Sequence, residues 1–317
     1  MWTEIIASSL RNNGHHVDSC YHNRKTLLDR AVLAGVSLRH GEQRRAAWKH
    51  RHRQQLIKAM SHSRWDVLLS IQGALDRHTA KHLRQHSPHL KIIYWWGDIL
   101  TEQAQRRINE AAGFSDKLLL SYLGSYKTLK PVYRDKLAYF PFGASREFHT
   151  AGSLSARDHK RFTAEVVFVG TYYPERCALI LYLNTQLDTP VSVWGRGWRK
   201  CRGIRHHGAL SLADSLKVYH CSRISLNLHH VDTPNGCNMK FYEIHAAGGF
   251  QICDWQALMN STELGRQTVT CRSLPEFAEQ VHYYLAHEQE RQQILKENSQ
   301  TVFSTADYQT RLDELIK

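Results

Sequence analysis

The sequence lacks any apolar segment long enough to cross a membrane. A transmembrane helix needs roughly 20 apolar residues, whereas the best apolar runs, such as Asp66–Ile71 and Val166–Gly170, have the length of single strands. The basic, apolar and small-residue blocks of a signal peptide are also missing from the N-terminus. We therefore expect a cytoplasmic protein, whose excess of cations allows peripheral contact with the inner membrane surface.

Metal-binding and disulfide motifs are also scarce. The number of cysteines is odd and no Cys-x-x-Cys motif occurs, so we expect the cysteines to act as small buried hydrophobic residues. Neighbouring histidines in a strand point to opposite faces, so the pairs His206-His207 and His229-His230 do not suit one metal ion, and no carboxylate or cysteine accompanies them at ligand spacing. We predict no metal site.

Positive charge is abundant and unevenly placed. The net charge is +13, and residues 1–148 hold 24 Lys and Arg against 12 Asp and Glu, while residues 149–317 hold 18 against 17. Seven of these cations lie in Arg39–Lys58, beside the single acid Glu42. The segment fits a solvated helix face or a contact with an anionic acceptor, a lipid surface or nucleic acid. No helix-turn-helix, zinc-finger or RNA-binding signature occurs, which weakens the nucleic-acid alternative.

Short apolar runs alternate with helical patterns along the whole chain, and no internal repeat occurs. Such alternation predicts an α/β fold with parallel strands, and 317 residues suffice for about two domains. We expect two doubly wound Rossmann-like domains, residues 1–148 and 149–317, that face a central cleft, with the last helix packing back on the N-terminal domain. Because the chain starts almost directly in a helix, Glu4–Asn13, either the first strand is missing or the domain is unusual. The expected strands are 65–71, 90–96, 117–121, 137–140, 165–170, 191–194, 224–228 and 250–254.

Residues 225–254 carry the strongest chemical signal. The pattern predicts a strand, the loop Pro234–Asn238, a helix from about Met239 to Ala247, a glycine turn and another strand. Backbone N–H groups at the start of such a helix suit phosphate binding, and Lys240 adds a cation. Glu243 can accept hydrogen bonds from a sugar hydroxyl. The alternative is an ordinary helix cap followed by an exposed glutamate.

This segment resembles the donor site of group 1 GT-B glycosyltransferases, most closely the CgeB-like branch with its Asn-Gly-x-Asn-x-Arg/Lys-x-x-Glu…Gly-Gly-Phe pattern. The resemblance implies that Glu243 binds the nucleotide ribose and that Gly236, Cys237 and Asn238 offer backbone groups to the donor sugar. Asn235 stands where the wider superfamily has a glutamate, which leaves any catalytic or sugar-orienting role of that position open.

Further segments match the same family in the expected order. Val167–Arg176 resembles the first strand of the donor domain, with Gly170 and Thr171 at the turn and Arg176 near the phosphates. Gly195 and Gly197 resemble the Gly-x-Gly turn beneath the nucleotide base. The resemblance also extends to the interdomain segment Tyr139–Ala144, and to the strand end Ile93–Asp98 that faces the cleft.

The resemblance implies transfer of a sugar from a nucleotide-diphosphate donor, with retention and without a metal or other cofactor. Arg176 and Lys240 are the candidates for stabilising the diphosphate leaving group. Asp98 is the candidate for positioning or deprotonating an acceptor hydroxyl, or else a helix N-cap. His229 or His230 is expected to face the donor, because both precede the phosphate loop.

The acceptor is expected to be a cell-surface glycan, a lipid-linked glycan or a protein. The alternatives are a nucleic-acid-binding or DNA-modifying protein on the same scaffold and an inactive homologue. A Ser225–His245–Asp254 hydrolase triad is rejected because Gly-x-Ser-x-Gly is absent. The oligomeric state is left open.

Overall fold

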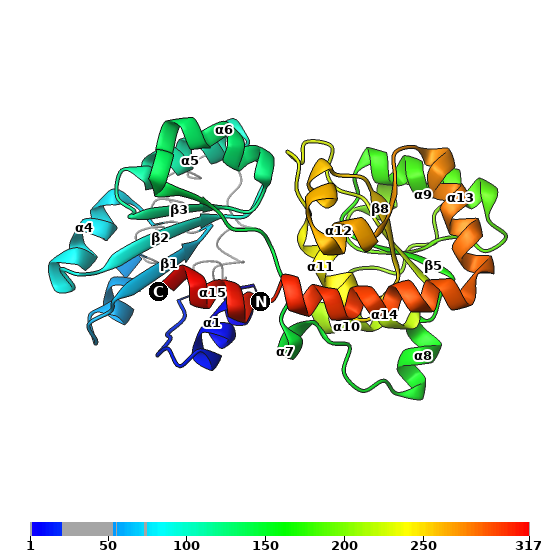
Figure 1. Cartoon of the computed structure of the whole chain (residues 1–317), viewed down its shortest axis with the longest axis horizontal. Coiled ribbons are helices and arrows are strands. Elements are labelled where there is room, and N and C mark those ends of the chain that lie inside the picture. The colour runs from blue at the N-terminus through cyan, green and yellow to red at the C-terminus, as the bar shows by residue number, and fades with distance from the viewer. Residues whose placement is uncertain (1, 21–52, 55, 73–74, 317) are drawn as a thin grey trace, which may run out of the picture. The chain divides into compact units, whose positions relative to one another are not determined.

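The structure is a computed structural model that describes residues 2–20, 53–54, 56–72 and 75–316. The chain divides into two compact units (Figure 1). The N-terminal unit comprises residues 16–140, and the C-terminal unit comprises residues 141–317 together with residues 1–15. Most of the predicted basic segment Arg39–Lys58 lies outside the described residues.

The N-terminal unit is built on a parallel sheet. Its strands are β1 (Val67–Ile71), β2 (Lys91–Trp96), β3 (Lys117–Leu120) and β4 (Leu137–Tyr139), and they lie in the order β1-β2-β3-β4. The described strands thus follow chain order, whereas a doubly wound sheet reverses direction once. The connecting elements are α4 (Arg77–His86), α5 (Glu102–Ala112), α6 (Leu123–Tyr133) and the 3₁₀ turn η1 (Arg134–Lys136).

The C-terminal unit contains a parallel sheet with the order β6-β5-β7-β8-β9, which reverses direction between β6 and β7 as a doubly wound sheet does. The strands are β5 (Val166–Val169), β6 (Ser192–Trp194), β7 (Ile224–Asn227), β8 (Gln251–Asp254) and β9 (Val269–Cys271). The helices are α1 (Trp2–Asn12), α7 (Arg146–His149), α8 (Ala156–Phe162), α9 (Pro174–Gln186), α10 (Leu212–Cys221), α11 (Met239–Ala246), α12 (Glu263–Gln267), α13 (Leu274–Ala286), α14 (Glu288–Thr305) and α15 (Tyr308–Ile316), with the 3₁₀ turns η2 (Trp198–Lys200) and η3 (Ala257–Ser261).

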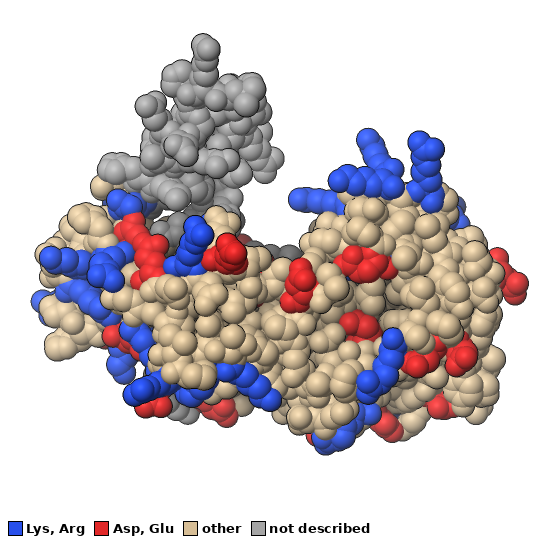
Figure 2. Space-filling view, turned by 90° about the horizontal axis from the view of Figure 1, so that it is seen from above, with Lys and Arg blue, Asp and Glu red and all other residues tan. Residues whose placement is uncertain are grey.

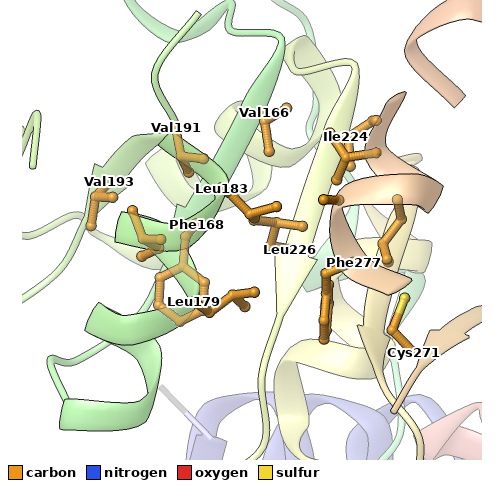
Figure 3. Close-up of a cluster of buried hydrophobic side chains, with 14 of the residues drawn as sticks. Val166, Phe168, Leu179, Leu183, Val191, Val193, Ile224, Leu226, Cys271 and Phe277 are labelled. Carbon is orange, nitrogen blue, oxygen red and sulfur yellow. The ribbon is translucent and has the colours of Figure 1, made fainter. Parts of the chain in front are cut away.

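The α/β fold with two parallel sheets confirms the predicted fold class, and each expected strand is present. Continuous apolar runs made the strands recognisable, because strands of a covered parallel sheet are buried on both faces. In the C-terminal unit, Phe168 and Leu226 of adjacent strands pack against Leu179 and Leu183 of α9 and Phe277 of α13 (Figure 3). The short strand β9 was not predicted.

The unit boundary lies earlier than predicted, at residues 140 and 141, and α1 belongs to the C-terminal unit. The segment after Phe140 is bound to the end of α14, since the Ala144 N–H donates to the Ala306 carbonyl over 2.9 Å. The Tyr308 N–H in turn donates to the Ala144 carbonyl over 2.8 Å. The last helix, α15, packs on α1 within this unit.

The expectation that the cysteines act as small buried hydrophobic residues is wrong for two of them. Cys177 of α9 and Cys201, which follows η2, form a disulfide, with their Cα atoms 6.1 Å apart. This distance lies within the range that a disulfide spans, and the tight turn at η2 brings Cys201 there. The expectation of small buried hydrophobic residues holds for Cys237, Cys253 and Cys271. In the described part of the chain, no helix has the length and apolar composition to cross a membrane.

Candidate functional site

The structure gathers the predicted donor-site residues at one edge of the C-terminal sheet. Gly170 and Thr171 follow β5, the turn at Gly195 follows β6, and His229 follows β7. The strands are parallel and adjacent, so their carboxyl ends meet at this edge, where doubly wound folds bind ligands. We call it the strand-end site.

The loops after β5 and β6 lie against one another. The Gly170 N–H donates to the Trp194 carbonyl over 2.8 Å, and the Tyr172 N–H donates to the Arg196 carbonyl over 2.8 Å. A Cβ atom on Gly195 would lie 1.8 Å from the Gly170 carbonyl oxygen, and Gly195 has φ +141°. The close approach of the two loops therefore requires glycine at this position.

Arg176 joins the loops after β5 and β7. The guanidinium is buried and donates to the Thr171 carbonyl (3.0 Å) and to the Leu228 carbonyl (2.8 Å). It also lies over the Tyr173 ring, 4.8 Å from the centroid. Through these contacts Arg176 connects the loop after β5 to the loop after β7. Its contact with donor phosphates stays a prediction.

His229 joins the loop after β7 to the end of β8. Its backbone N–H and its Nδ1 each lie 2.7 Å from Oδ1 of Asp254, the last residue of β8. Burial raises the pKa of Asp254, but the hydrogen bonds and charge of His229 outweigh it and the pKa is lowered. Nε2 of His229 is buried and has no hydrogen-bond partner among the described residues. His229 is thus enclosed in the edge of the site, so its expected contact with a donor stays a prediction.

The loop before α11 is also fixed by side chains that the sequence analysis had assigned to the donor. Asn238 caps α11, because its Oδ1 accepts a hydrogen bond from the Phe241 N–H (3.0 Å). Asn235 has φ +48°, and its Oδ1 accepts from the Leu258 N–H of η3 (2.7 Å). The loop therefore presents a capped helix start with Gly236 and Cys237 buried beneath it and Lys240 half-buried in its first turn.

A buried polar network that sequence reasoning missed supports this loop. The amides of Asn238 and Asn227 bond reciprocally over 3.0 and 3.2 Å, and Asn227 donates to Gln251 (3.0 Å). Gln251 contacts Nε2 of His245 (2.8 Å), which also lies 3.1 Å from the Thr268 hydroxyl. Burial lowers the pKa of His245 to about 3. The signal in the sequence was Asn227, a polar residue at the end of the buried strand β7.

Glu243 is the most unusual residue of the site. The residue is buried, with 7% exposed, and no hydrogen bond joins its carboxyl to another residue that the structure describes. Burial raises its pKa, and Lys240 lowers it in part. The carboxyl oxygens are not sealed from solvent, so they can accept hydrogen bonds from a ligand. The alternative of an exposed glutamate after a helix cap is wrong.

Asp98 lies in the N-terminal unit, just beyond the carboxyl end of β2. Its side chain is exposed, and Oδ1 accepts a hydrogen bond from the Ile99 N–H over 2.8 Å. The N-cap of the following helix, α5, is Thr101. The N-cap alternative for Asp98 is therefore wrong, and the carboxylate keeps hydrogen-bonding capacity toward solvent.

In the described residues, the strand-end site coincides with neither a metal-ligand cluster nor the surface pocket found in the N-terminal unit. No group of three His, Cys, Asp or Glu side chains is placed to hold a metal ion in the ranges that the structure covers. A surface pocket of about 370 Å³ in the N-terminal unit has no predicted site residue in its lining, which is Arg77, Ala80, Lys81, Arg84, Gln85, Gly113 and Phe114.

Comparisons with known proteins identify the fold. Residues 176–317 match the family described as glycosyl transferase-like. A glycosyltransferase from Rickettsia africae ESF-5 is similar over 99% of this chain and 92% of its own, with a TM-score of 0.61 and 11% identity. The fold is that of GT-B glycosyltransferases. The family match points to glycosyl transfer for residues 176–317, and the structural likeness, at 11% identity, establishes the fold.

Two further GT-B structures are similar. One is a mutant of Staphylococcus aureus TarM in complex with Fondaparinux, alpha-GlcNAc-glycerol and UDP. The similarity covers 84% of this chain and 58% of the TarM chain, with 8% identity and a TM-score of 0.58. The DNA-modifying enzyme beta-glucosyltransferase covers 80% of this chain and 82% of its own at 10% identity, with a TM-score of 0.51. A search of curated proteins found no significant match. At these identities the structures establish the GT-B fold, while the CgeB-like branch stays a prediction.

Proposed function

We propose that the chain transfers a sugar from a nucleotide-diphosphate donor to a glycan, lipid-linked or protein acceptor. The observation that carries this proposal is Glu243, a largely buried carboxyl with a raised pKa and no hydrogen bond to another described residue, one turn into a helix that starts at the strand-end site. Two ribose hydroxyls would supply the donors that the carboxylate lacks, and would favour its charged form.

The diphosphate would lie at the start of α11. The N-terminus of a helix favours negative charge, and Lys240 lies in its first turn. As the bond between sugar and diphosphate breaks, these groups would stabilise the charge that develops on the leaving oxygen. This arrangement needs no metal, and we propose a metal-independent transfer with retention, in keeping with the CgeB-like pattern.

The other predicted residues take supporting roles in this proposal. Arg176, His229, Asn235 and Asn238 hold the loops of the site at fixed positions through the contacts described above, and the glycines allow those loops to approach closely. Asp98, exposed at the end of β2, is proposed to orient or deprotonate the acceptor hydroxyl.

The test is donor binding by wild-type protein and by Glu243→Gln. Glutamine keeps the size of the buried side chain and removes only its charge, so the fold is expected to survive. A charge-assisted hydrogen bond contributes about 1.5–3 kcal/mol, which corresponds to a loss of about 10-fold to 150-fold in donor affinity. Thermal-shift titrations with UDP-, GDP-, dTDP- and CMP-sugars would first identify the base, since a ligand of the native state raises its stability.

The matched control is Glu279→Gln, which removes a carboxylate from the exposed face of α13 and is expected to leave donor affinity unchanged. Unaltered affinity in Glu243→Gln would remove the ribose assignment. No thermal shift with any nucleotide-sugar would favour the inactive or nucleic-acid-binding alternatives.

A further inference from the structure

A short loop of the C-terminal unit concentrates exposed cations. It covers residues 196–205, which we call the basic loop, and holds Arg196, Arg199, Lys200, Arg202 and Arg205 with no acidic residue among them. All five side chains are exposed, and none forms an ion pair with another residue that the structure describes. Figure 2 shows Lys and Arg side chains projecting together from the C-terminal unit, at upper right.

The loop is held rigidly beneath these side chains. Trp198 is 1% exposed and its Nε1–H donates to the Gly170 carbonyl over 2.7 Å. The disulfide fixes Cys201 to α9. At the far end, the Val193 N–H of β6 donates to the Arg205 carbonyl over 3.1 Å. These anchors hold the backbone of the loop, so its five cations stay on one short segment whose positive potential favours an anionic partner.

After Gly197 the loop runs back along β6. Residue His206 pairs with Val193 in parallel, so the chain must return from the carboxyl end of β6 toward its amino end between Gly197 and Arg205. On the way it passes α9, where a Cβ atom on Gly203 would lie 3.7 Å from Leu181 Cδ2.

We propose that the basic loop docks the protein on a membrane surface that contains anionic lipid. Clusters of four to eight Lys and Arg are typical of such docking. Leu181 beside the loop is 38% exposed, which adds an apolar side chain to the same surface. Single-stranded nucleic acid instead favours exposed aromatic rings for stacking, and the one aromatic residue of the loop, Trp198, is buried. This docking does not depend on sugar transfer.

The experiment measures binding to phosphatidylglycerol–phosphatidylcholine vesicles by co-sedimentation over a range of lipid concentrations. The variant combines Arg199→Gln, Lys200→Gln and Arg202→Gln, and spares Arg196 because of its place in the Gly195–Gly197 turn. Each cation near an anionic surface contributes about 1 kcal/mol, so the triple variant is expected to bind about 100-fold more weakly. Wild-type binding is expected to fall as salt rises and to be absent with pure phosphatidylcholine.

The control removes three exposed cations that are dispersed over the fold, Lys81→Gln, Lys127→Gln and Lys296→Gln. It matches the change in net charge and is expected to retain most of the vesicle binding. Equal losses in the two triple variants would overturn the proposal, as would undiminished binding by the basic-loop variant. Retention of duplex DNA that the basic-loop substitutions abolish, with vesicle binding unaffected, would assign the loop to nucleic acid. Donor-induced thermal shifts, measured in parallel, report on the strand-end site separately.

Discussion

The disulfide between Cys177 and Cys201 makes a quantitative prediction about the C-terminal unit. The bond joins residues 24 apart in the sequence. A cross-link of that span removes conformational entropy from the unfolded chain, which corresponds to about 3.4 kcal/mol at 25 °C. In a folding unit of about 150–250 residues, each kcal/mol shifts the midpoint by about 2–4 °C, so reduction is expected to lower it by about 7–14 °C.

The assay is thermal unfolding with and without a reductant, followed by calorimetry and by tryptophan fluorescence. Trp198 packs within the C-terminal core and lies three residues before Cys201, so its emission reports on this unit. The described cysteine of the N-terminal unit, Cys20, is free. The transition of the N-terminal unit should therefore not respond to the reductant and serves as an internal reference.

Two controls separate loss of the disulfide from other effects of the reductant. The double variant Cys177→Ala with Cys201→Ala is expected to unfold at the reduced midpoint and to show no further change when reductant is added. Cys20→Ser is expected to behave as wild type in both conditions. Alkylation of unfolded, unreduced protein should label the five free cysteines and leave these two unlabelled. Labelling of all seven, or an unchanged midpoint after complete reduction, would refute the reasoning.

Two more stability predictions follow from buried polar groups. Burial lowers the pKa of His149 to about 4, so between pH 6.5 and about pH 4 the unfolded state binds a proton that the folded state does not. The free energy of unfolding should therefore fall by about 1.4 kcal/mol per pH unit over this range. Urea unfolding at several pH values should show a shallower decline for His149→Gln, and equal slopes would contradict this account. Asn238→Ala should cost about 1–2 kcal/mol for the lost cap and a further 1–3 kcal/mol because the Asn227 amide oxygen loses its donor, while its nitrogen keeps Gln251. The reference is Ser211→Ala, which removes only the cap of α10. Equal losses in the two variants would mean that the network adds nothing.

The strands could be predicted because each carries its own signal. Val166–Val169 and Ile92–Trp96 are continuous apolar runs bounded by polar or glycine residues, and burial on both faces of a parallel sheet demands that composition. Strand β9, Val-Thr-Cys, has three residues and no such contrast with its surroundings. Its place is set by pairing with β8, which is a tertiary contact.

Contacts between distant residues account for most of what the sequence analysis missed. Asn235 was interpreted as a replaced acid, yet its side chain accepts from the Leu258 N–H, 23 residues away. The His229–Asp254 pair spans 25 residues, but His229 follows β7 and Asp254 ends the neighbouring strand β8, so the strand order alone would have suggested it. Cys177 and Cys201 have no motif spacing, and only the path of η2 brings them together.

Averaging over half of the chain concealed the basic loop. The second half is almost neutral overall, which suggested that the protein meets its anionic partner through the first half. Yet residues 196–205 hold five cations and no acid, and their charge is cancelled in the sum by acids elsewhere, such as Glu288 and Glu290 on α14. Electrostatic attraction acts over about a Debye length of 8–10 Å, so the local arrangement decides where an anionic surface binds. Charge therefore has to be counted over segments of that dimension, and on that scale the C-terminal unit carries a docking surface of its own.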